Sequence, residues 1–63
     1  MEKWQQDVIA ERDAFGARIT SFRSELESAL PAATEAEAAR LAKQLHLYEQ
    51  LHALLSQRAA EFS

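Results

Sequence analysis

Hydrophobic residues recur every three or four positions through both halves of the chain, which is the spacing of one face of an α-helix. In the first half they form a single stripe with one gap, between Val8 and Phe15, where Glu11 and Arg12 stand. The stripe comprises Met1, Trp4, Val8, Phe15, Ile19, Phe22, Leu26 and Ala29. Its spacing predicts a helix over about residues 2–29. Gly16, beside the stripe, indicates a close helix–helix approach, a hinge or a ligand contact.

The second half carries two hydrophobic stripes. The first comprises Leu41, Leu45, Tyr48, Leu55, Ala59 and Phe62, and His52 stands at its missing step. The second, which we call the leucine stripe, consists of Leu47, Leu51 and Leu54 and is rotated by about 100° around the helix. A two-helix hairpin covers one stripe on each helix. We therefore expect the leucine stripe to be exposed and to form an interface with another chain.

A break between the two patterns lies at Pro31, which disfavours helical conformation at Leu30 and lacks a backbone donor. Thr34 and Glu37 then form a capping-box pattern, in which each side chain bonds the other residue's backbone N–H. These signals predict a connection at residues 30–34 and a second helix over about 35–61. The fold class is therefore all-α: a single antiparallel two-helix hairpin over residues 1–63, with residue i level with about 64 − i, assembling into a homo-oligomeric helical bundle.

Composition narrows the function. A chain of 63 residues has a small core and usually needs a disulfide, a metal or other chains for stability, and this chain has no cysteine. Its net charge of −3 argues against nucleic-acid binding, because phosphate neutralisation dominates that affinity. No apolar run approaches the roughly 20 residues of a membrane span, and the N-terminus does not resemble a signal peptide. We expect a cytoplasmic protein that associates with itself.

Three polar residues fall on the predicted contact between the helices: Glu11, Arg12 and His52. We interpret them as a polar layer in which His52 bonds Glu11 or Arg12, since such layers fix register in helical bundles. The alternative is a metal site, because Glu-x-x-His occurs in metal-binding bundles. Glu49, however, lies about 60° from His52 around the helix, toward solvent. We expect no metal and no cofactor.

Arg40 and Arg58 stand at the two ends of the leucine stripe. An arginine on an apolar face is either an interfacial ion-pair partner or an anion ligand. In the ligand version, Trp4 and Tyr48 are candidates for stacking on a nucleotide base, although each is typical of a helix contact as well. The chain shows no nucleophile with its base, no glycine-rich phosphate loop and no paired carboxylates, so we expect no enzyme.

Both ends of the chain carry a more specific pattern. The motifs are Trp4-Gln5-Gln6-x-Val8-Ile9-x-Glu11 near the start and Gln44-Leu45, Leu54-Leu55-x-x-Arg58 and Phe62 in the second half. In these positions the chain resembles a family of very short tailed-phage proteins related to a crAss-like phage protein. It departs from that pattern at Tyr48, Leu51 and Ala59. The resemblance covers nearly the whole chain but carries over no functional residues.

The resemblance implies a phage or prophage accessory protein acting in the cytoplasm of an infected bacterial host. The leading hypothesis is therefore a self-associating helical hairpin that binds a host protein, as a counter-defence factor. The second is a sponge that sequesters a cyclic nucleotide signal at oligomer seams. The third is a hairpin dimer that binds nucleic acid, or a purely structural oligomer.

Overall fold

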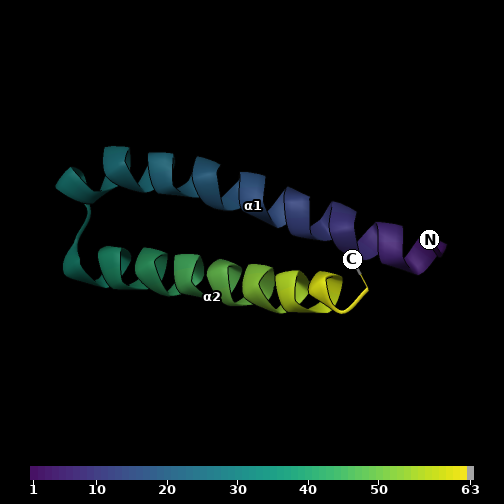
Figure 1. Ribbon diagram of the computed structural model, residues 1–63. Helices are drawn as coiled ribbons and strands as arrows, with labels where there is room; N and C mark the ends of the chain where they lie inside the picture. The colour runs from purple at the N-terminus through teal and green to yellow at the C-terminus, as the bar shows by residue number, and fades with distance from the viewer. Residues whose placement is uncertain (63) are drawn as a thin grey trace.

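The computed structural model describes residues 1–62 and shows two long helices lying antiparallel (Figure 1). Helix α1 spans Lys3–Ala29, a short 3₁₀ helix η1 spans Leu30–Ala32, and α2 spans Glu35–Ala60. The molecule measures 46 × 15 × 13 Å, and the start of α1 and the end of α2 lie at the same end of it. The all-helical hairpin expected from the sequence pattern is confirmed. Each helix is one residue shorter at its outer end than the range the pattern predicts.

The connection owes its shape to Pro31 and Thr34. Pro31 lies in η1, and the two residues after that turn, Ala33 and Thr34, adopt extended backbone conformations that reverse the chain. The Thr34 hydroxyl oxygen accepts a hydrogen bond from the Glu37 N–H at 3.1 Å, which caps α2. The reciprocal bond predicted, from the Thr34 backbone N–H to the Glu37 carboxylate, is not formed within residues 1–62. The cap therefore depends on the threonine side chain.

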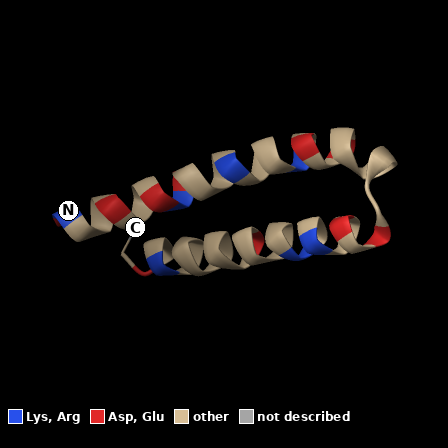
Figure 2. Ribbon diagram, turned by 180° about the vertical axis from the view of Figure 1, so that it is seen from behind, with Lys and Arg blue, Asp and Glu red and all other residues tan. Residues whose placement is uncertain are grey.

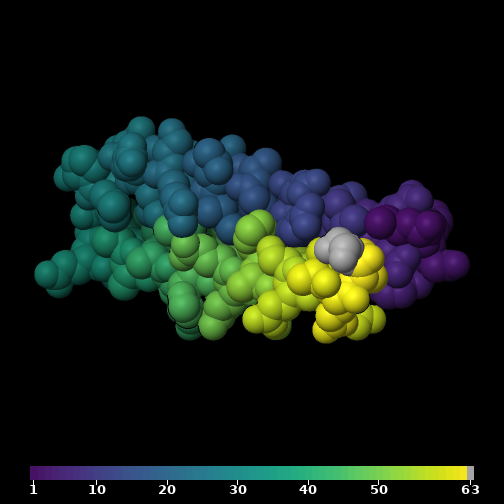
Figure 3. Space-filling view, viewed as in Figure 1, coloured from purple at the N-terminus to yellow at the C-terminus, as the bar shows by residue number. Residues whose placement is uncertain are grey.

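The hydrophobic contact between the helices is one side chain wide. Within residues 1–62 only Ile19 and Ala59 are buried; most other apolar residues of the contact are half-buried, and Trp4 is exposed. The Tyr48 ring packs between two α1 aromatics, with its centroid 6.2 Å from that of Phe15 and 5.5 Å from that of Phe22. In the space-filling view α1 covers one side of α2 along most of its length (Figure 3). The hairpin thus holds a seam rather than an enclosed core.

Two contacts across the hairpin define its register. The Trp4 and Phe62 rings meet edge to face with centroids 5.3 Å apart, and a Cβ placed on Gly16 would lie 3.4 Å from the His52 ring. Residue i of α1 therefore lies level with about residue 67 − i of α2, and the predicted 64 − i is wrong. The reason is the connection: η1 continues α1 by nearly another turn, so the chain reverses after Ala32.

Candidate interaction surface

The leucine stripe lies on a side of α2 that α1 does not cover. Leu47 is 49% exposed, Leu51 is 44% exposed and Leu54 is 62% exposed. The three follow one another at steps of four and three residues, so they form a continuous row along the helix. The hairpin leaves this row open, as the pattern predicts. That the leucine stripe forms an interface with another chain stays a prediction.

Arg58 continues the row toward the open end of the hairpin, where it contacts its own chain. Its guanidinium carbon lies 5.2 Å from the centroid of the Trp4 ring, and its Nη1 lies 2.9 Å from a carboxylate oxygen of Glu61. Trp4 is 47% exposed and also packs edge-on against Phe62. An exposed cation–π contact contributes about 0.5–1 kcal/mol, and an exposed ion pair contributes less. Arg58 therefore helps to hold the end of α2 against the start of α1.

The structure does not bring the other proposed ligand residues to Arg58. Tyr48 lies about 15 Å away along α2, at 1.5 Å per residue, with Phe15 and Phe22 packed against its ring. Its hydroxyl oxygen accepts a hydrogen bond from the Gln44 side chain at 3.0 Å. Arg40 is exposed at the other end of the leucine stripe and has no ion-pair partner within residues 1–62. Of the four residues, only Trp4 and Arg58 are neighbours.

The polar layer predicted at Glu11, Arg12 and His52 takes a different form. Glu11 is exposed, and Arg12 pairs with its neighbour Asp13 at 3.1 Å. The His52 ring lies against Gly16 instead. The predicted hydrogen bond between His52 and Glu11 or Arg12 is absent from the described part of the chain, because the true register moves Glu11 about one turn away from His52. In the described part of the chain, these three residues therefore form no hydrogen bonds with one another.

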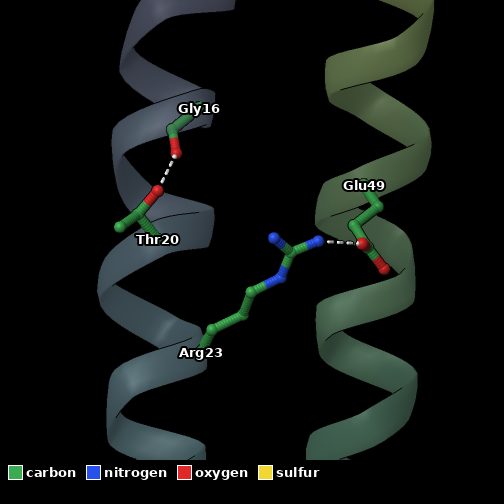
Figure 4. A network of polar contacts seen from close by, with 4 residues as sticks. All are labelled: Gly16, Thr20, Arg23 and Glu49. Carbon is green, nitrogen blue, oxygen red and sulfur yellow. Dashed lines mark hydrogen bonds and ion pairs between the residues drawn. The ribbon is translucent and has the colours of Figure 1, made fainter.

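A shallow groove opens beside His52, on the flank of the hairpin that carries Gly16. It has a volume of ≈ 380 Å³ and is lined by Gly16, Ile19, Thr20, Arg23, Glu49 and His52. An ion pair bridges the helices here, with Arg23 Nη2 at 2.6 Å from a Glu49 carboxylate oxygen, and the Thr20 hydroxyl donates to the Gly16 carbonyl at 3.2 Å (Figure 4). The sequence reading missed Arg23. The signal available was the opposite charge of two residues that flank the seam on facing helices.

Glu49 lines this groove beside His52, so the expectation that it points toward solvent holds only in part. Its side chain is 42% exposed, and its carboxylate is paired with Arg23. Residues 1–62 contain no group of three or more His, Asp or Glu side chains placed to hold a metal ion. The groove therefore presents an arginine–carboxylate pair and an imidazole to solvent.

A smaller hollow lies near the connection, on the other flank of the hairpin. Its volume is ≈ 120 Å³, and its lining is largely apolar: Phe22, Glu25, Leu26, Ala29 and Leu41. Ala29 is the last residue of α1, and its short side chain leaves this space open. The sequence pattern gave no sign of the hollow, because it depends on how the two helices pack against each other near the connection.

Lys and Arg positions are interspersed with Asp and Glu positions along both helices of the described chain (Figure 2). This distribution and the net charge of −3 lack the continuous basic strip that phosphate binding requires. Neither α1 nor α2 is long and apolar enough to cross a lipid bilayer, in the part of the chain that the structure describes.

Comparisons with known proteins add no information about this surface. No family model matches the chain, and neither a curated protein nor a solved structure is significantly similar to it. The resemblance to short tailed-phage proteins therefore stays a prediction from the two sequence motifs.

Proposed function

We propose that this chain is a non-enzymatic interaction protein that self-associates and acts by binding another protein. The observation that carries the proposal is the exposed leucine stripe. Full burial of an exposed leucine side chain contributes about 1.5–3 kcal/mol, and these three leucines, 44–62% exposed, have about half of that left to gain, which favours association. Apolar rows rimmed by charged residues are typical of protein–protein interfaces. Arg40 and Arg58 supply such a rim at the two ends of the stripe.

The resemblance to short tailed-phage proteins supports a narrower form of the proposal. In that form the protein is a phage or prophage accessory factor in the cytoplasm of an infected bacterium, and its partner is a host defence protein. A helical hairpin suits this role, because the leucine stripe is already arranged as a row along one helix before it meets a partner.

The test of self-association is the double variant Leu47→Glu/Leu54→Glu. Two carboxylates in the stripe would have to be desolvated in any apolar interface, which is prohibitive. We expect the wild-type chain to have an oligomer's mass by light scattering and the variant to have the mass of one chain or to lose its helical circular dichroism.

The matched control is His46→Glu/Ala53→Glu. It places two glutamates at the same seven-residue spacing, one position earlier, where both residues are exposed and face about 100° away from the stripe. The control should keep the wild-type mass. A wild-type chain that remains a folded single chain at all concentrations would contradict the proposal.

A second candidate function is nucleotide binding, which one observation favours: the Arg58 guanidinium and the exposed Trp4 ring lie together. A base could stack on the indole while its phosphate meets the arginine. Titration calorimetry with cyclic mono- and dinucleotides tests this function. Binding that disappears in Arg58→Gln supports it, and no heat from any of these nucleotides rejects it.

A further inference from the structure

We infer that the leucine stripe is covered by the α2 helix of a second copy of this chain, running antiparallel, so that two hairpins form a four-helix bundle. The inference rests on the proposed self-association and specifies its partner and geometry. Three features of the surface support it: the area left exposed, the spacing and charge along the stripe, and a match between Trp4 and the hollow near the connection.

The exposed area is close to what one half of a dimer contributes. A compact monomeric protein of 7.1 kDa has an accessible surface of about 4,100 Å². This chain has 4731 Å². The excess is roughly 650 Å², and a stable interface of standard size buries about 800 Å² on each partner. One further chain of the same kind is enough to cover the excess.

The spacing of residues along α2 indicates that two neighbouring helices pack on it, about 90° apart around its axis. The leucine stripe extends with the same alternating steps of four and three residues, back through Gln44 to Arg40 and on through Arg58 to Glu61. The row that packs on α1 has identical steps, each one residue later, from Leu41 to Phe62. Two such rows, about 100° apart, suit a helix at the corner of a square four-helix bundle, where its two neighbours lie about 90° apart.

The chemistry of the two helices selects α2 as the neighbour. On α1, Trp4 is followed at seven-residue steps by Glu11, Arg18 and Glu25, so the side of α1 nearest the leucine stripe is charged. An α1 helix of a second copy packed on the stripe would set these charges against leucines, whereas in the bundle joined through α2 they face the charged side of the second α1. A second α2 sets leucine against leucine, which gives the self-complementary contact of a two-fold dimer.

The charges at the ends of the stripe select the antiparallel direction. When Leu47 lies level with Leu54 of the second copy, Arg40 lies level with that copy's Glu61, whose carboxylate also pairs with its own Arg58. A parallel pair would instead set Arg40 beside Arg40 and Arg58 beside Arg58, which is repulsive. Arg40 has no ion-pair partner in the described residues of its own chain, so its guanidinium is available to a carboxylate of the second copy.

The same arrangement brings Trp4 to the hollow at Ala29. Trp4 contacts Arg58, and the hollow includes Glu25, so both lie on the side of the hairpin that carries the stripe. The point halfway between Leu47 and Leu54 is level with the point on α1 halfway between Trp4 and Ala29, by the register of the hairpin. A two-fold axis through that level places the Trp4 ring of each copy over the hollow of the other.

Spin labels measure the direction of the second copy, and the absence of cysteine makes single-site labelling clean. We choose Ala39→Cys and Ala53→Cys, which are both exposed and lie outside the stripe. In the antiparallel dimer the two labels at position 39 are separated by roughly 34 Å along the axis, and those at position 53 by under about 10 Å. The measured distance should therefore be longer at position 39 by on the order of 15 Å. Equal distances at the two positions would overturn the arrangement.

A second variant tests the contact of Trp4. Ala29→Gln fills the hollow with a neutral side chain, and Ala17→Gln makes the same change on an exposed outer position of α1. We expect Ala29→Gln to raise the dissociation constant of the dimer about tenfold and to shift the Trp4 fluorescence toward the red, whereas Ala17→Gln changes neither. No change in Ala29→Gln would overturn the Trp4 contact. A wild-type chain that never dimerises would instead reject the proposed self-association itself.

Discussion

Gly16 offers the sharpest test of how the two helices fit together. It lies in the middle of α1, and the nearest atom to a Cβ added there is Nε2 of His52, at 3.4 Å, followed by Cδ2 at 3.7 Å. Those distances are ordinary van der Waals contacts, and the backbone of α2 is not among the close neighbours. Gly16 therefore has room for a methyl group. We expect Gly16→Ala to stabilise the protein.

The size of the effect follows from the helix. Alanine in a helix interior is more favourable than glycine by about 0.8–1.0 kcal/mol, mainly because glycine loses more backbone freedom on folding. The new methyl group adds contact with the His52 ring and removes little space from the ≈ 380 Å³ groove. In a domain of this size, 1 kcal/mol changes the melting temperature by about 4–8 °C. We expect Gly16→Ala to raise it by that amount.

The assay is thermal unfolding followed by circular dichroism, at one protein concentration because association makes the melting temperature concentration-dependent. The matched control is Ala17→Gly, an exposed site on the same helix, which should lower the melting temperature by a similar amount. A lower melting temperature for Gly16→Ala would refute the reasoning. It would mean that the helices approach each other more closely at Gly16 than the His52 contact shows.

Two further predictions concern bonds within the hairpin. The Arg23–Glu49 pair bridges the helices but is half exposed, so a double-mutant cycle with Arg23→Ala and Glu49→Ala should give a coupling of about 0.2–1 kcal/mol that shrinks in 1 M salt; a coupling unaffected by salt would show that the contact is not ionic. Thr34→Ala should reduce the free energy of unfolding by about 1 kcal/mol, because the Glu37 N–H loses its partner, whereas Thr34→Ser should be near neutral. Equal losses in these two variants would mean that the hydroxyl is not the cap.

Local signals in the sequence predicted the hairpin well. Pro31 and Thr34 each act through their own backbone and immediate neighbours, so the helix boundaries follow from short-range chemistry. The leucine stripe was also predictable, because the step from Leu47 to Leu51 to Leu54 determines which side of the helix they share.

What depends on the connection was not predictable from these signals. The 3₁₀ turn at Leu30–Ala32 displaces α2 by about three residues relative to α1, and that displacement sets His52 against Gly16 rather than level with Glu11. The contact between the Trp4 and Phe62 rings could not be predicted without knowing this displacement. Arg58 was predicted as an interface or ligand residue from its place on one helix. Its contact with the Trp4 ring involves the other end of the chain, where helix periodicity carries no information.

The narrow seam of the hairpin has a consequence for the lifetime of the protein in a cell. With only Ile19 and Ala59 buried among residues 1–62, a single chain has little to hold its helices together, and a protease needs only brief local opening to cut it. When a second copy docks on the leucine stripe, mass action lowers the fraction of single chains that are open to proteolysis. Under the proposed assembly, the amount of protein made governs how long each molecule survives. Strong expression gives a durable population, and weak expression is cleared by turnover.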